Sequence, residues 1–200
     1  MCNDYRLNSD IEMIRRDFEN IRVRIRFPEG IPNVQPRDDV RITDSAPIVR
    51  TTLDEPAVAD LVQRRWSWPG PGGKPVYNYR SENREFGISE TGGRCLIIAD
   101  GFYEFTTHSD PKSKRKHKWL FTKVGEPIFC IAGIWRTASD VGEAFTMLTT
   151  EPGPDVAAYH NRQVAVLDRS DWARWLDPKV SAKDILRTLP AGSLNVEQVC

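Results

Sequence analysis

The second residue of the sequence is a cysteine, and this position gives it two nucleophilic groups. Removal of the initiator methionine is normal before a small residue, and it leaves Cys2 with a free α-amine beside its thiol. The ordinary pKa values are about 8 for the amine and about 8.5 for the thiol, so both groups are partly nucleophilic near neutral pH. Such a 1,2-aminothiol condenses with an aldehyde to an imine, which the thiol closes to a five-membered thiazolidine. Chance also places cysteines at this position, so the interpretation depends on other residues.

Two further residues could move protons. If the strand pleat is unbroken, Glu104 lies on the same face as apolar residues of the run 96–102. Burial there raises the pKa of a carboxyl, which suits a general acid or base; the alternative is that Gly101 marks a bulge and Glu104 turns to solvent. His160 is the histidine that lies outside a charged or polar run, and it can titrate near neutrality. Its alternative role is a helix cap or a hydrogen-bonded core histidine.

Three segments could contact a nucleic acid. Asn78–Glu82 combines an amide, a guanidinium and a hydroxyl, which can orient a nucleophile and bind phosphate, or form a simple turn. Trp66 and Trp68 are candidates for stacking on bases, although both could equally fill a core. The basic run Lys112–Lys118 could contact phosphate, while most such runs are solvated surfaces.

The composition predicts one soluble domain over residues 1–200. Apolar residues make up 40% and charged residues 28% of the 200 residues, which excludes disordered, collagen-like and membrane-spanning chains. No apolar run approaches the roughly 20 residues of a membrane helix, and the N-terminus lacks an apolar signal core. We therefore expect a cytoplasmic, nucleoid-associated protein. Basic and acidic residues balance at 28 each, so net charge neither requires nor excludes a polyanionic partner.

No metal or cofactor is expected. The four cysteines lack the C-x-x-C spacing of a zinc or redox site, and there are only three histidines. Cys95 and Cys130 lie in apolar runs and are expected to be buried. The glycine patterns of dinucleotide and nucleoside triphosphate sites do not occur.

The elements that position these residues are mostly strands. In the first half, a capping box at Ser9–Glu12 predicts the start of a short helix, and the alternation over Ile21–Phe27 predicts a strand. Residues 28–48 are predicted to form a loop and Ala57–Arg65 a short helix. Pro69–Gly73 is expected to interrupt regular structure. The predicted strands of the second half are Cys95–Ala99, Phe102–Thr107, Lys118–Val124, Ile128–Trp135, Ala144–Thr150 and Val164–Leu167. Short helices are predicted at Pro154–Tyr159, Asp171–Leu176 and Ala182–Leu189, with Ser170 and Ser181 as N-caps. The class is α+β, with a mixed, mostly antiparallel, curled and barrel-like sheet and peripheral short helices.

Several motifs of the sequence, and the order in which they follow along the chain, resemble those of the SRAP family, the SOS-response-associated peptidases. Arg94–Phe105 closely matches the family's R-C-L-I-P-A-D-G-F-Y-E-W, and Asn78–Glu82 resembles its N-A-R-S-E. Further matches are Met1-Cys2, Arg65-Trp66, Pro127–Trp135, Phe145–Glu151 and His160–Arg162. The ordered set covers residues 1–167 and is much more specific than any one motif.

The resemblance implies a barrel-like domain that recognises abasic sites in single-stranded DNA, often near a junction with duplex, during the DNA damage response. It implies that mature Cys2 forms a thiazolidine crosslink with the sugar aldehyde, that Asn78 holds the reacting groups, and that Glu104 and His160 shuttle protons. Arg80 and Arg162 match phosphate-binding positions, with Ser81, Trp66 and Trp68 as further DNA-contact candidates. The resemblance also implies lyase-like and autopeptidase activities. We further expect a monomer, and the lack of long apolar runs predicts no membrane partner.

Departures from the family pattern lie at the rim of the site. The family start M-C-G-R is Met1-Cys2-Asn3-Asp4 here, so an acid replaces a base beside Cys2. Gln163-Val164 replaces the M-P that follows H-x-R in the family. Two alternative functions stay open on the sequence alone. One is a cysteine peptidase with Cys2 as nucleophile, His160 as base and Asn78 or Glu104 as orienting residue; the other is a catalytically silent DNA-binding module.

Overall fold

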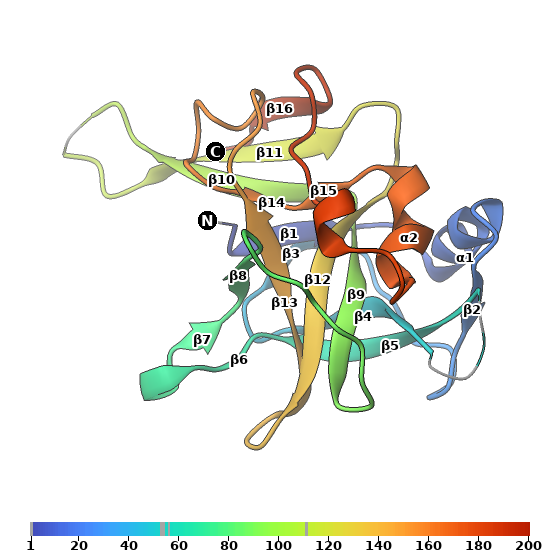
Figure 1. The fold of residues 1–200 in the computed structure, drawn as a ribbon. Coiled ribbons are helices and arrows are strands. Elements are labelled where there is room, and N and C mark those ends of the chain that lie inside the picture. The colour runs from blue at the N-terminus through green and yellow to red at the C-terminus, as the bar shows by residue number, and fades with distance from the viewer. Residues whose placement is uncertain (1, 53–54, 56, 111) are drawn as a thin grey trace.

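A closed ring of five strands forms the centre of the molecule (Figure 1). The computed structural model describes residues 2–52, 55, 57–110 and 112–200. In the ring, β13 pairs with β12, β12 with β9, β9 with β4 and β4 with β5, and a parallel pairing of β5 with β13 closes the barrel. The bounds are β4 (Ser45–Thr51), β5 (Val58–Trp66), β9 (Gly92–Ala99), β12 (Phe129–Ala138) and β13 (Gly142–Thr150).

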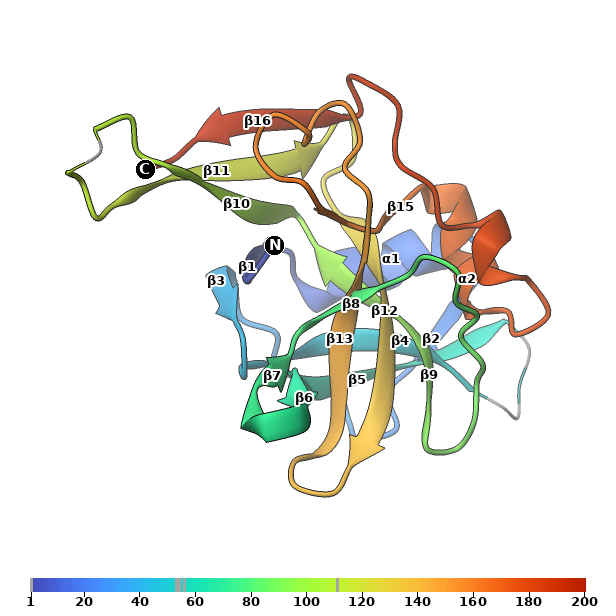
Figure 2. The ribbon, with the colours of Figure 1, turned by 60° about the vertical axis from the view of Figure 1, so that its left-hand side comes forward.

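A second sheet packs at one end of the barrel and continues from it through Asp100, which joins β9 to β10. Its strands run in the order β16-β11-β10-β1-β3, all antiparallel. Their bounds are β1 (Asp4–Leu7), β3 (Arg37–Arg41), β10 (Gly101–Thr107), β11 (Lys116–Lys123) and β16 (Leu194–Gln198). Figure 2 shows β10, β11 and β16 of this sheet above the barrel, with the β10–β11 hairpin projecting away from the body.

The remaining elements are short. The helices are α1 (Ile11–Asn20) and α2 (Trp172–Leu176), with 3-10 turns η1 (Pro71–Gly73), η2 (Arg169–Asp171) and η3 (Ala182–Asp184). The short strands are β2 (Arg24–Arg26), β6 (Trp68–Pro69), β7 (Pro75–Val76), β8 (Asn78–Arg80), β14 (Gln163–Val164) and β15 (Val166–Leu167). No helix in the described part of the chain is long and apolar enough to cross a membrane.

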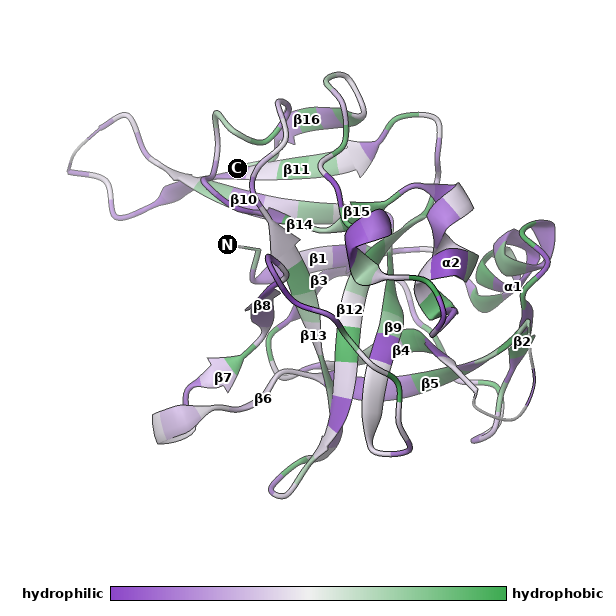
Figure 3. Ribbon diagram, viewed as in Figure 1, coloured by the Kyte–Doolittle hydropathy of each residue, from purple (hydrophilic) through white to green (hydrophobic). Residues whose placement is uncertain are grey.

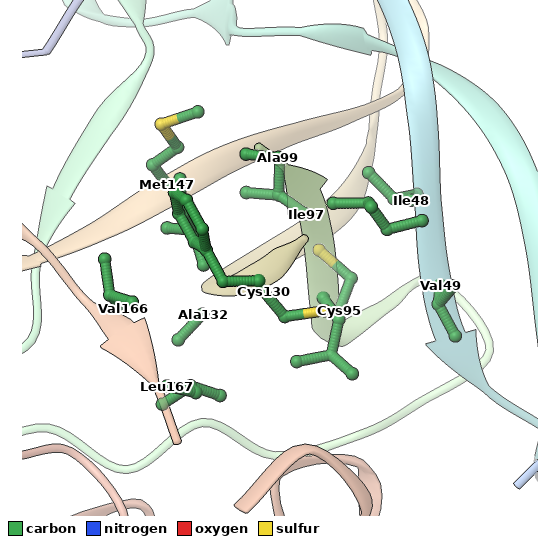
Figure 4. Packing of buried hydrophobic residues seen from close by; sticks show 14 of the residues in the cluster. Ile48, Val49, Cys95, Ile97, Ala99, Cys130, Ala132, Met147, Val166 and Leu167 are labelled. Atoms are coloured by element: carbon green, nitrogen blue, oxygen red, sulfur yellow. The ribbon is translucent and has the colours of Figure 1, made fainter. Parts of the chain in front are cut away.

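The hydrophobic core fills the barrel, and Figure 4 shows how side chains of several strands meet there. Figure 3 shows that the barrel strands contain many apolar residues. Cys95 and Cys130 are fully buried among these side chains, as the sequence predicts. Gly133 on β12 is required for this packing, because a Cβ atom there would lie 2.6 Å from the Ile97 side chain and 3.0 Å from the Thr146 carbonyl oxygen. The barrel therefore depends on close contact between β12 and its neighbours.

The predicted α+β class with a curled, mostly antiparallel sheet is confirmed, and the main errors lie in the first half. The predicted helix Ala57–Arg65 is wrong: this segment forms most of β5, whose first five residues are all buried. A strand covered on both faces lacks polar alternation, so its sequence is easily mistaken for a helix. The predicted loop over residues 28–48 is also wrong in part, because it contains β3 and the start of β4.

Smaller corrections concern element ends. The predicted strand Ile21–Phe27 shortens to β2 because Ile21 caps α1 and Arg22 turns with a φ of 61°. The side chain that caps α1 is Asp10, which accepts a hydrogen bond from Met13 N, rather than Ser9. Residues 154–159 form turns, and the helix predicted over 182–189 is only η3, which Ser181 caps as predicted. Ser170 lies inside η2 and is not an N-cap.

Candidate active site at Cys2

The backbone of Cys2 is held on both sides by predicted site residues. The Asn78 side-chain amide donates to the Cys2 carbonyl oxygen at 2.7 Å. On the other side, the Cys2 backbone N–H donates a hydrogen bond to the Glu104 carboxyl. The Cys2 thiol is buried and donates to the Asp4 carbonyl oxygen at 3.2 Å. Three of the predicted catalytic residues therefore meet at one point.

Strand pairing explains this meeting of distant segments. β1 runs antiparallel to β10 with Tyr5 opposite Phe102, which carries the chain start back along β10 toward Glu104. β8 runs parallel to β13 with Asn78 opposite Met147, so Asn78 approaches from the barrel side. Figures 1 and 2 both show the start of β1 between β10 and β8.

Glu104 is a buried carboxyl with a raised pKa. Its residue is 1% exposed, so the predicted burial is confirmed and the alternative of a bulge that turns it to solvent is wrong. Desolvation raises the pKa of Glu104 to about 7, while the hydrogen bond from the Cys2 N–H lowers it in part. A carboxyl with this pKa holds or releases a proton near neutral pH, directly at the Cys2 nitrogen.

The Cys2 thiol has the opposite character from an activated nucleophile. Burial raises its pKa well above the ordinary value, and the negative charge of Glu104 raises it further. The thiol is therefore protonated near neutral pH. In this environment the nitrogen of Cys2, which lies against Glu104, is better placed than the sulfur to begin a reaction.

A charged cluster next to Cys2 was not predicted. Lys118 Nζ lies 2.8 Å from Asp4 Oδ2 and 2.5 Å from Asp39 Oδ1, and 3.7 Å from the centre of the Tyr103 ring. Burial raises the pKa of Asp4 to about 6, while Lys118 lowers it in part. Lys118 therefore compensates the acid that stands where the family has a base. The replacement at position 4 was the one signal in the sequence for such a partner.

His160 lies in the loop between β13 and β14, next to Arg162. Its Nδ1 lies 2.9 Å from the Arg162 backbone nitrogen and 3.1 Å from the Arg162 carbonyl oxygen, so it accepts from the first or donates to the second according to the tautomer of the ring. Burial lowers the pKa of His160, an effect that its hydrogen bond with the Arg162 backbone partly opposes. The imidazole is thus neutral at neutral pH and can accept a proton.

The predicted phosphate-binding arginines differ in their surroundings. Arg80, at the end of β8, is exposed. Arg162 forms a two-pronged ion pair with Glu82 and donates to the Thr149 carbonyl oxygen at 2.8 Å. Ser81 is buried, and its hydroxyl donates to the same carbonyl oxygen at 2.9 Å. Arg162 and Ser81 thus tie β8 and the His160 loop to the end of β13.

The two tryptophans do not offer surfaces for stacking. Trp66 is fully buried, donates through Nε1 to the Tyr77 carbonyl oxygen at 2.9 Å and packs edge-on against Tyr5. Trp68 is 4% exposed, and the Arg136 guanidinium covers its ring at 4.5 Å. The prediction that they stack on bases is therefore wrong for this structure, and the alternative of core filling is correct.

A cavity of about 360 Å³ with polar and apolar lining opens next to Asn3 and Asp4, which follow Cys2 in the chain. Its lining residues are Asn3, Asp4, Arg41, Ile42, Phe105 and Lys118. A larger cavity of about 480 Å³ lies elsewhere, between Val58 and Leu176, and contains none of the residues described above. The described residues include no cluster of three or more His, Cys, Asp or Glu side chains that could hold a metal ion.

Comparison with known proteins agrees with the resemblance. The family model described as SOS response associated peptidase (SRAP) matches residues 1–200. A relative in Bacillus subtilis, abasic site processing protein YoqW, is 25% identical over 94% of this chain and 86% of its own length. Another from the same organism, abasic site processing protein YoaM, is 31% identical over 48% of this chain and 43% of its own length.

Solved structures show the same fold. A protein from Bordetella bronchiseptica superposes with a TM-score of 0.71 at 22% identity, covering all of both chains. A protein from Bacteroides thetaiotaomicron superposes with a TM-score of 0.73 at 16% identity, covering all of this chain and 92% of that one. With the family model matched along the whole sequence, the chain belongs to the SOS-response-associated peptidase family.

Proposed function

We propose that this protein recognises abasic sites in single-stranded DNA and joins them covalently through Cys2. The observation that carries the proposal is the hold on Cys2: Glu104 at its nitrogen and Asn78 at its carbonyl oxygen. Membership of the family and the names of relatives called abasic site processing proteins support the same substrate. The role that we propose for this covalent link is to protect the damaged strand from breakage.

The reaction requires removal of Met1, because the nitrogen of Cys2 must be an amine. The amine attacks the aldehyde carbon of the ring-opened sugar, and the resulting carbinolamine loses its hydroxyl as water to form an imine. The sulfur then bonds to the imine carbon, and the thiol proton passes to nitrogen. The sum is aldehyde plus aminothiol giving thiazolidine plus water, with no oxidant or metal.

Glu104 and His160 are assigned the proton transfers. As a carboxylate, Glu104 accepts a proton from the Cys2 amine; as an acid, it returns one when the hydroxyl leaves as water. A pKa of about 7 lets it serve in both forms near neutral pH. His160 is neutral there and is assigned to the sugar oxygen. Asn78 acts as a positioning residue, because its amide holds the backbone of the nucleophile.

A peptidase acting on other proteins through a Cys2 thiolate has less support. Such an enzyme needs a thiol whose pKa is lowered by a neighbouring base. Here burial and the charge of Glu104 raise the thiol pKa, and the thiol donates to a backbone carbonyl. Binding at junctions with duplex, action as a monomer and association with the nucleoid remain parts of the proposal.

The test is crosslinking to a single strand that contains one abasic site. Wild-type protein lacking Met1 should give a heat-resistant covalent band, and Cys2→Ala should give none while still binding the DNA, because phosphate contacts supply most sequence-independent affinity. Cys2→Ser should form an imine that borohydride traps but no thiazolidine. Crosslinking by Cys2→Ala at the wild-type level would refute the proposal.

A further inference from the structure

We propose that the β10–β11 hairpin is a clamp for the DNA backbone beside the reactive site, formed by the basic segment Lys112–Lys116. This inference rests on the proposed function and extends its DNA-binding surface. The segment contains Lys112, Lys114, Arg115 and Lys116, and all four side chains are exposed. Their partner is the sugar-phosphate backbone that flanks the abasic nucleotide.

The hairpin charges are available to a ligand, in contrast to most of the protein's cations. Among the described residues, no carboxylate pairs with any of these four side chains. Arg64, Lys118, Lys123 and Arg187, by comparison, each contact two acidic residues. A molecule with zero net charge thus keeps a concentrated positive charge at one projecting tip. Such an unneutralised cluster attracts a polyanion and releases its counterions on binding.

The strand pairing relates the position of this charge to the Cys2 site. Lys116 and Lys118 are two residues apart on β11, so their side chains leave the same face of the sheet. Lys118 on that face reaches Asp4, two residues from Cys2, while Glu104 points to the opposite face, so the hairpin flanks the site rather than facing the Glu104 carboxyl. Lys116 pairs with Thr107, three residues beyond Glu104 on β10, which places it roughly 10 Å further along the strand.

That spacing fits DNA. Phosphates of one strand follow at about 3.4 Å along a duplex and further apart in an extended strand, so the clamp meets phosphates about two to three nucleotides from the abasic site and beyond. Figures 1 and 2 show the hairpin projecting on the side of the molecule where the N-terminus is marked. Figure 3 shows that the loop is hydrophilic.

The base of the hairpin is braced, so its direction is fixed before DNA binds. His108 stacks on His117 at 4.6 Å, and Trp119 packs against Tyr159 at 4.8 Å. Trp119 Nε1 also donates to Thr106 Oγ1 at 2.8 Å across the two strands. β16 covers the outer edge of β11. A braced hairpin loses little conformational freedom on binding, so its charge contributes to affinity.

The test compares two double variants with the same change of charge. Lys114→Ala/Arg115→Ala removes one lysine and one arginine from the hairpin, and Arg16→Ala/Lys179→Ala removes one of each from exposed positions on α1 and after α2. The probe is a single strand with a tetrahydrofuran abasic analogue, which lacks the aldehyde, and about eight nucleotides on each side. Binding is measured over a range of salt concentrations.

The hairpin variant should bind about tenfold more weakly at low salt, with a salt slope smaller in magnitude by about 1.4. The control should bind like wild type, and both should keep the wild-type melting temperature. The hairpin should contact the strand on one side of the abasic site only. Shortening the probe to about one nucleotide on that side should abolish the difference in affinity between the hairpin variant and wild type, and shortening it on the other side should not. Equal slopes for the two double variants, or a difference that survives shortening on either side, would overturn the proposal.

The crosslinking reaction gives an independent readout. At saturating aldehyde-containing DNA, the hairpin variant should crosslink at the wild-type rate, because Lys114 and Arg115 are remote from Cys2. If wild type does not crosslink but the hairpin variant shows the smaller salt slope, the proposed chemistry is refuted and the clamp is supported. A protein that crosslinks normally without the salt effect would refute the clamp alone.

Discussion

Glu104 is the side chain whose environment most strongly shapes the chemistry of the site. Its pKa of about 7 arises from burial, and the same burial brings it to the nitrogen of Cys2. The sequence predicted this residue because a carboxyl in an apolar run is costly unless it has a function or a partner. The cluster of Asp4, Lys118 and Asp39 could not be predicted, because its members come from three strands that are distant in sequence.

Glu104→Gln should slow crosslinking by about 10²-fold or more. It should also remove the rise in rate that wild type shows between about pH 6 and 8, as Glu104 ionises with its pKa of about 7. The reason is that only the carboxylate accepts a proton from the amine. Initial crosslinking rates at several pH values provide the measurement. A glutamine variant with the wild-type pH profile would exclude Glu104 as the proton acceptor.

The same substitution has a stability signature of defined sign. The folded pKa of about 7 exceeds the ordinary 4.5, so the contribution of Glu104 to stability is complete below pH 4.5 and is lost as the pH rises through 7. Wild type should therefore lose stability relative to Glu104→Gln between pH 5 and pH 8, by up to about 3 kcal/mol. Urea unfolding at both pH values measures this difference.

His160→Ala should slow both formation and reversal of the crosslink, by about 10²-fold or somewhat less, because one catalyst accelerates a step in both directions. The variant would form the crosslink slowly and then retain it. A time course followed by transfer to excess competitor abasic DNA measures both rates. Wild-type rates in both directions would make His160 a structural residue.

At the scale of elements, local patterns predicted the strands of the second half and failed where tertiary burial overrides them. β9 to β13 are bounded by turn residues and rich in β-branched and aromatic residues, so the sequence predicts them as strands. β5 is covered on both faces and resembles a helix, and β3 lies in a segment whose prolines and charges resemble a loop. The pairing of β8 with β13, which positions Asn78, has no local signal.

Arg162 joins β8, the His160 loop and the end of β13, so substitution of Arg162 and substitution of Arg80 should affect stability differently. Arg162→Ala should lower the free energy of unfolding by about 1–3 kcal/mol, because it leaves Glu82 without its ion pair and removes the hydrogen bond to Thr149. Arg80→Ala is the matched control: Arg80 is exposed, so stability should be unchanged while the salt slope of DNA binding falls. Equal melting temperatures for wild type and Arg162→Ala would contradict this structural role.

At the scale of the whole molecule, the barrel holds the second sheet and thereby fixes β1 and β10 against each other. The alternation of the sequence predicted a curled sheet, but closure through the parallel pairing of β5 and β13 joins residues about 80 positions apart and could not be predicted locally. Gly133 on β12 marks a close contact of this strand with β9 and β13 inside the barrel.

Gly133→Ala should destabilise the protein by about 1–3 kcal/mol, because the added methyl meets Ile97, Cys95 and a backbone carbonyl oxygen in the core. Gly87→Ala is the control, since a Cβ there meets nothing within 4 Å. Thermal unfolding of the two variants makes the comparison. Equal melting temperatures would show that the barrel can relax around β12.

The central claim is that Cys2 supplies both bonds to the sugar. Mass spectrometry of the N-terminal peptide, taken from protein crosslinked to an abasic strand and digested, measures this directly. The account predicts a peptide that begins at Cys2, lacks Met1, and carries the abasic sugar with the loss of one water, in a form that borohydride does not alter. An adduct on any other residue, or a Cys2 adduct that borohydride reduces as an imine, would contradict it.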